Sequence, residues 1–189
     1  MPAQTCKRLI PAIAREVGVP TSLLMAIASV ESRFEAYAVN HAGTSLSFES
    51  PGEALSYVEE QLSQGEDNMD IGCMQVNWQC HKDNLQSLGK DSRDLLIPST
   101  NIRYAARFLK TLYAELGTWA KAVAAYHSRH SHSGTQYLIR VANAIKEART
   151  ESLLTTTRLN ITGQTLWKRQ DRDDNAFSGF YCSELKLLT

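Results

Sequence analysis

Residues 28–34 of the chain read Ala-Ser-Val-Glu-Ser-Arg-Phe, and they place an acidic side chain against an apolar helix face. We expect a helix from Thr21 to about Phe34, because apolar residues recur there at helical spacing. Glu31 follows Ile27 by four residues and therefore lies at the edge of the apolar face. Partial burial disfavours a charged carboxylate and raises its pKa toward the range that a general acid needs. The alternative is an exposed Glu in the last helical turn, which is the common position for this residue type.

Two later segments have to be explained together with Glu31. Residues 70–78 read Asp-Ile-Gly-Cys-Met-Gln-Val-Asn-Trp, and residues 122–127 read Ala-Val-Ala-Ala-Tyr-His. In this order the three segments resemble the catalytic domain of family 1 (SLT-type) lytic transglycosylases. Enzymes of that family cut bacterial peptidoglycan and share the lysozyme-like fold.

Four matches carry the resemblance, which runs from about residue 6 to residue 145. The first is the pair Glu31-Ser32, and the second is residues 72–77, similar to the family's Gly-Leu-Met-Gln-(Ile/Val)-Asn. The third is Asn101-Ile102, which opens a helix, and the fourth is residues 124–126, similar to the start of the family's Ala-Ala-Tyr-Asn. Each match alone is weak, but four in the family's order are improbable by chance.

The resemblance and the helical periodicity together predict a mainly α, lysozyme-like domain over residues 1–150. A short extended segment is expected near residue 72, and an irregular tail is expected over residues 151–189. This tail is interpreted as a docked arm, a partner-binding segment or a disordered end, since residues 155–157 favour extended or turn structure. An insertion at about 41–69 carries its own helix signal, a capping Ser50 followed by Pro51, and is expected to form part of one wall of the cleft.

The resemblance also implies a mechanism. Glu31 is the expected single acid and base, and the substrate N-acetyl group supports the anomeric carbon in place of a second carboxylate. The product is then a 1,6-anhydroMurNAc end. Tyr126 is the second catalytic candidate, and the expected sugar-binding residues are Ser32, Met74, Gln75 and Asn77.

Three alternatives stay open at this stage. A hydrolytic muramidase needs a second carboxylate to activate water, and Asp70 is the candidate. A domain that only binds glycan or a partner is the non-enzymatic alternative. Core packing is the structural alternative for Met74 and Tyr126, because Met and aromatic side chains are usually buried.

Two motif positions depart from the family. Cys73 replaces an apolar residue, usually Leu, and His127 replaces the Asn that commonly follows the Tyr. An even number of cysteines in an exported protein permits up to two disulfides, with Cys182 as the expected partner for a cysteine in the body of the domain. A reduced, buried Cys73 is the alternative. The four cysteines are Cys6, Cys73, Cys80 and Cys182.

Composition restricts the remaining possibilities. The 20 basic and 20 acidic residues balance, so no nucleic-acid partner is expected. No apolar run approaches the roughly 20 residues of a membrane helix, and the start of the chain is not of the secretory type. Because the resemblance implies a peptidoglycan substrate, we expect a periplasmic or otherwise exported monomer whose signal peptide has been removed or which uses another route. No cofactor is expected. No metal site is expected at His127, His130 and His132 either, because residues 128–134 read as a polar loop. Possible partners, by analogy, are a secretion, pilus or flagellar apparatus.

Overall fold

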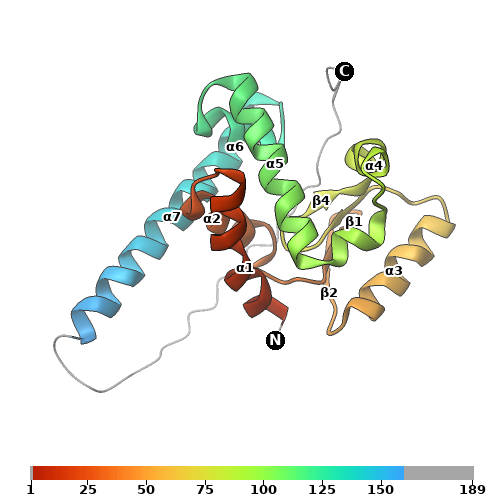
Figure 1. Ribbon diagram of the computed structural model, residues 1–189, viewed down its shortest axis with the longest axis horizontal. Coiled ribbons are helices and arrows are strands. Elements are labelled where there is room, and N and C mark those ends of the chain that lie inside the picture. Colours follow the sequence, from red (N-terminus) through yellow and green to blue (C-terminus); the bar gives the residue numbers. More distant parts are fainter. Residues whose placement is uncertain (1, 160–189) are drawn as a thin grey trace.

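The computed structural model describes residues 2–159 of the 189-residue chain, with side chains described for residues 4–152. Two groups of elements make up this part (Figure 1). In the helical group, α5 packs against α1 and α6, while α2 packs against α1 and α7. The members of the helical group are α1 (Pro2–Val17), α2 (Thr21–Ser32), α5 (Pro98–Leu116), α6 (Trp119–His127) and α7 (Ser131–Leu159).

The second group is a small antiparallel sheet with short helices around it. Strand order is β2-β1-β3-β4, and the register sets Asp70 opposite both Asn40 and Asn77. The strands are β1 (Ala38–His41), β2 (Thr44–Ser47), β3 (Met69–Ile71) and β4 (Val76–Asn77). The helices beside them are α3 (Pro51–Ser63), α4 (Trp78–Ser87) and the 3-10 helix η1 (Ser92–Leu96).

The mainly α fold class is confirmed, but the sheet is larger than the single extended segment that the sequence predicted. The β1–β2 hairpin was missed. Its turn uses Ala42 and Gly43, both in the left-handed backbone region at φ of 50° and 79°. A two-residue turn of this kind suits the twist of a hairpin, yet Ala-Gly is a weaker signal than Asn-Gly because alanine rarely adopts positive φ.

The helix that carries Glu31 ends earlier than predicted. Arg33 follows α2 in the left-handed region at φ 55°. Its N–H donates to the Ser29 carbonyl, and the Phe34 N–H donates to the Ala28 carbonyl. Phe34, the predicted helix end, lies outside α2 at φ 69°. Glu31 is therefore the penultimate residue of the helix. The predicted α3 start is confirmed, since Ser50 Oγ accepts a hydrogen bond from the Glu53 N–H at 3.2 Å.

Helix α7 corrects two local predictions. It begins at Ser131, inside the stretch expected as a polar loop, and it continues through residues 155–157, which were expected to have extended or turn structure. Gly134 permits the close approach of α6, because a Cβ there would lie 2.8 Å from the carbonyl oxygen of Ser128. The division at residue 150 stays a prediction, although α7 runs across it. The predicted tail beyond Leu159 lies outside the described residues.

A disulfide joins Cys6 of α1 to Cys73, which lies in the turn between β3 and β4. The alternative of a reduced Cys73 is therefore wrong. The expected role of Cys182 lies outside the described residues. Among the helices that the structure describes, none has the length and apolar character needed to cross a membrane. Within the same residues, no group of three or more His, Cys, Asp or Glu side chains is placed to hold a metal ion.

Candidate active site

Glu31 is a buried carboxyl group at the C-terminal end of α2. Only 6% of its surface is exposed, and within the described residues its Oε1 atom has no hydrogen-bond partner. Burial raises the pKa of Glu31 to about 8, because the ionised form loses its hydration. The predicted position at a buried helix face is thus confirmed. Glu31 is mostly protonated at pH 7, as a general acid has to be.

Tyr137 of α7 faces this carboxyl group, and the sequence analysis did not single it out. The phenol is fully buried, and its proximity lowers the pKa of Glu31, partly offsetting the effect of burial. The contact falls short of a full hydrogen bond, since within the described chain Tyr137 Oη has no hydrogen-bond partner. The exposed Arg140, one turn later, also lowers the pKa of Glu31 through its positive charge.

Asp70 of β3 is the second buried carboxyl group of the site. Its exposed fraction is 6%, and burial raises its pKa to about 7, while a hydrogen bond from Asn77 Nδ2 to Asp70 Oδ1 at 2.9 Å partly offsets the rise. The negative charge of Asp70 in turn raises the pKa of Glu31. Two carboxyl groups therefore lie close enough to influence each other, one from each group of elements.

The turn over residues 72–75 connects the two groups. Ser32 Oγ, next to Glu31, donates to the Cys73 carbonyl at 2.8 Å. Tyr126 Oη, from α6, donates to the Met74 carbonyl at 2.8 Å. The Cys6–Cys73 disulfide adds a covalent link to α1. Three helices thus hold the turn against the end of α2 that carries Glu31.

Asn101 of α5 holds the same turn through both the nitrogen and the oxygen of its side-chain amide. Its Nδ2 donates to the Ile71 carbonyl at 2.8 Å, and its Oδ1 accepts from the Met74 N–H at 2.9 Å. Gly72 makes this approach possible: it adopts φ 78°, and a Cβ there would overlap the Asn101 side chain. The Asn101 match in the sequence therefore marks a residue that fixes the turn.

Gln75 and Asn77, two of the predicted sugar-binding residues, use their amide donors within the protein. Gln75 Nε2 donates to the Gly72 carbonyl at 2.9 Å and to the Ala38 carbonyl at 3.3 Å. Asn77 caps α4 through its Oδ1, which accepts from Cys80 N–H, and donates from Nδ2 to Asn68 and Asp70. Both residues shape the site, and their contact with sugar stays a prediction, as it does for Ser32 and Met74.

Tyr126 and His127 end α6 beside the same cluster. Tyr126 is buried, and its ring stacks at 6.5 Å on that of Tyr137. His127 stacks on Tyr137 more closely, with ring centroids 4.6 Å apart and planes 7° from parallel. Burial lowers the pKa of His127 to about 4, and the positive charge of Arg140 adds to that effect. His127 is therefore neutral at physiological pH.

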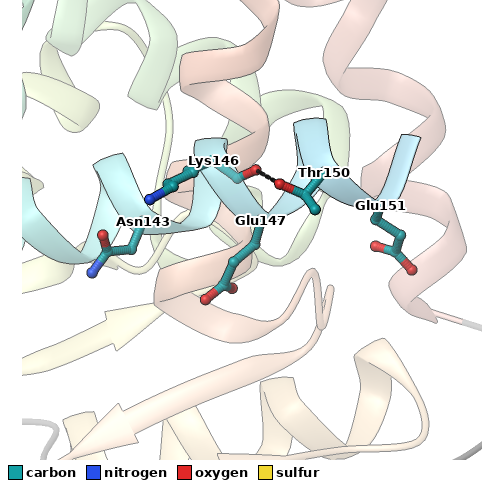
Figure 2. Close-up of a pocket in the computed structure, with 5 residues that line it drawn as sticks. All are labelled: Asn143, Lys146, Glu147, Thr150 and Glu151. Carbon is teal, nitrogen blue, oxygen red and sulfur yellow. Dashed lines mark hydrogen bonds between the residues drawn. The ribbon is translucent and has the colours of Figure 1, made fainter. Parts of the chain in front are cut away.

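A pocket further along α7 is lined by other residues than those around Glu31 (Figure 2). Its lining side chains all come from a single helix, and a hydrogen bond from Thr150 Oγ1 to the Lys146 carbonyl spans 3.0 Å. None of the buried titratable groups described above lines it. The lining residues are Asn143, Lys146, Glu147, Thr150 and Glu151.

A known family matches the part of the chain that contains this site. The family described as Transglycosylase SLT domain matches residues 8–151, a range that includes Glu31, the 72–77 motif and Tyr137. The chain belongs to this family. The match confirms the resemblance found in the sequence.

One relative of this SLT-family chain is Protein virB1 of Agrobacterium fabrum (strain C58 / ATCC 33970). The two are 36% identical over 98 residues, which are 51% of this chain and 38% of the relative. The alignment therefore spans well under half of that protein's length. No solved structure matches the chain at a significant level.

Proposed function

We propose that this SLT-family chain is a peptidoglycan lytic transglycosylase. It cleaves the β-1,4 bond between MurNAc and GlcNAc and leaves a 1,6-anhydroMurNAc end. The observation that carries the proposal is the Glu31 carboxyl group, which burial keeps protonated at neutral pH. A protonated carboxyl group is the proton source that the departing sugar oxygen requires.

In the first step Glu31 gives its proton to the glycosidic oxygen as the bond from that oxygen to C1 of MurNAc breaks. The carbonyl oxygen of the N-acetyl group bonds to C1 and carries its positive charge, as in other substrate-assisted glycosidases. In the second step the C6 hydroxyl oxygen attacks C1, the acetamido oxygen leaves, and Glu31 takes the hydroxyl proton. No water is consumed, and the carboxyl group is restored to its protonated form.

The residues around Glu31 have supporting roles in this proposal. Tyr126 is the second catalytic residue, which fixes the geometry of the turn through its hydrogen bond to the Met74 carbonyl. Met74 supplies an apolar wall for a sugar face. Ser32, Gln75 and Asn77 accept hydrogen bonds from sugar hydroxyl or acetamido N–H groups at their side-chain oxygen atoms.

A hydrolytic muramidase is the second candidate, and the buried Asp70 favours it. Inverting hydrolysis needs one protonated and one ionised carboxyl group on opposite sides of the bond. With pKa values of about 8 and about 7, Glu31 and Asp70 have the required order of acidity. In that reaction Asp70 would activate a water molecule, and the product would have a reducing end.

Digestion of purified peptidoglycan in 18O-labelled water separates the two candidates. The proposal predicts anhydro muropeptides that are lighter by one water than their hydrolysed counterparts and contain no label. Asp70→Asn should still form them, because its carboxylate takes no part in the transfer. Labelled reducing ends that disappear in Asp70→Asn would instead establish the muramidase.

We also propose that the chain acts outside the cytoplasm on the cell wall, opening it locally for an envelope machine. The Cys6–Cys73 disulfide supports an oxidising compartment such as the periplasm. Formal charge is balanced, so electrostatic attraction gives little steering toward the anionic wall, and a partner would have to place the enzyme. A secretion, pilus or flagellar apparatus is the proposed class of partner.

A further inference from the structure

Tyr137 is held mainly by the packing of its ring, because its polar contact with Glu31 falls short of a full hydrogen bond. Within the described residues its Oη atom has no hydrogen-bond partner, although the ring is fully buried. One neighbour is the His127 ring, nearly parallel at 4.6 Å. The Arg140 guanidinium lies 5.5 Å from the ring centroid, and Tyr126 stacks at 6.5 Å. His127 is the nearest of these three groups and the most nearly parallel of the rings.

The position of this phenol matters for Glu31. The two groups face each other in a buried space, and the phenol favours the ionised form of the carboxyl group. The other groups that face Glu31 are Asp70 from β3, Tyr126 from α6 and Arg140 from α7. A phenol without a hydrogen bond can rotate or shift when the surface behind its ring changes. The side chains that pack behind the Tyr137 ring therefore influence the pKa of the Glu31 carboxyl group.

We propose that His127 is a positioning residue, whose flat neutral ring holds the Tyr137 phenol against the Glu31 carboxyl group. The inference deepens the proposed transglycosylase function and rests on it. His127 itself does not exchange protons in the working range, since burial and Arg140 keep its pKa near 4. The ring acts through its shape, which the Asn common at this position in the family does not have.

Two substitutions separate shape from the loss of the imidazole. His127→Phe keeps a flat ring and removes both nitrogen atoms, whereas His127→Leu keeps apolar bulk and excludes water but offers no flat face. We expect kcat to remain within about twofold of wild type in the Phe variant. In the Leu variant it should fall roughly tenfold to a hundredfold, with little change in KM, because a misplaced group near the reacting atoms has that effect. His132→Leu, at an exposed position in α7, is the control.

The pH dependence of activity reports the pKa of Glu31, which a general loss of packing would not change. In the Leu variant the phenol no longer offsets the desolvation of Glu31, so the pKa of Glu31 rises further. Activity depends on the protonated carboxyl group, and the basic limb of the profile should therefore move to higher pH. The Phe variant should keep the wild-type limb. If the Leu variant does not fold, His127→Asn takes its place with the same expected shift.

A measurement without turnover keeps this inference separate from the proposed function. NMR titration of the Glu31 side-chain carboxyl carbon, assigned by its loss in Glu31→Gln, should show a higher pKa in His127→Leu and an unchanged pKa in His127→Phe. Equal titration in wild type and His127→Leu would overturn the positioning role, as would a Phe variant that behaves like Leu. Absence of anhydro products from the wild type would overturn the proposed function while leaving the titration result to stand.

Discussion

Replacing Glu31 with Gln should stabilise the protein at neutral pH while removing its activity. In the folded chain burial raises the pKa of Glu31 to about 8, against an ordinary value of 4.5. The unfolded chain therefore loses this proton between pH 4.5 and pH 8, whereas the folded chain retains it. Gln has no proton to lose, so the variant escapes the resulting free-energy cost.

The size of the effect follows from the two pKa values. Below pH 4.5 both states are protonated, and the carboxyl group makes no pH-dependent contribution. Each pH unit above that value favours the unfolded state by about 1.4 kcal/mol until the folded state ionises near pH 8. At pH 7 the cost to the wild type is about 3 kcal/mol. A buried Gln amide without hydrogen-bond partners lowers the free energy of unfolding by about 1–3 kcal/mol, and this effect does not depend on pH.

Urea unfolding at pH 4.5 and at pH 7 measures this difference. The free energy of unfolding of Glu31→Gln minus that of wild type should rise by about 3 kcal/mol between the two conditions. Glu59→Gln, at an exposed position in α3, is the matched control and should show a far smaller change. A difference that stays constant from pH 4.5 to pH 7 would refute the raised pKa and, with it, the reason for assigning Glu31 as the acid.

Three further predictions concern the turn beside Glu31. The double substitution Cys6→Ser with Cys73→Ser removes a covalent link between residues that are 67 apart in sequence. It should lower the free energy of unfolding, measured in urea, by about 4 kcal/mol. An unchanged urea midpoint would contradict a stabilising disulfide. Tyr126→Phe removes the hydroxyl that donates to the Met74 carbonyl and should lower the free energy of unfolding by about 1–3 kcal/mol. It should also slow, but not abolish, the release of anhydro products. Equal rates for this variant and wild type would show that Tyr126 serves only core packing. Gly72→Ala should disrupt the turn and reduce activity at least tenfold. The reason is that the added Cβ would overlap the Asn101 side chain and lie 2.6 Å from the Leu95 carbonyl oxygen. Full activity would show that the turn can shift to accommodate the Cβ.

The sequence predicted the long helices because their apolar residues repeat with the helical period over several turns. Segments α2, α3 and α5 belong to this class. The β1–β2 hairpin was missed because four-residue strands offer too few positions for an alternating pattern. The start of α7 was missed because Ser131, His132 and Ser133 read as a polar loop, while a glycine at position 134 suggested a turn and serves instead for close packing on α6.

The candidate site was predictable where its residues lie in motifs. Glu31 and Asp70 are of this kind, and their burial and raised pKa values follow from their surroundings. Tyr137 was not predicted, because it comes 106 positions after Glu31 and only the packing of α7 on α2 brings the two together. Its apolar helix face, with Val141 four residues later, was the only signal, and it indicates burial without indicating a partner.

The disulfide shows a different kind of limit. Four cysteines permit three pairings, and spacing alone cannot choose among them. Cys6 and Cys73 meet because α1 packs beside α2, whose end contacts the 72–75 turn. In the same way Asn101 was noted as the opening of a helix, whereas its side chain fixes the turn from both ends.

The most direct test of the account is a side-by-side digestion of purified peptidoglycan by wild type, Glu31→Gln and the exposed control Glu59→Gln, with mass analysis of the released muropeptides. The account predicts 1,6-anhydro products from wild type and from Glu59→Gln, and none from a Glu31→Gln protein that is folded and still binds the glycan. Anhydro products at an undiminished rate from Glu31→Gln would contradict the assignment of Glu31 as the acid and base of the reaction.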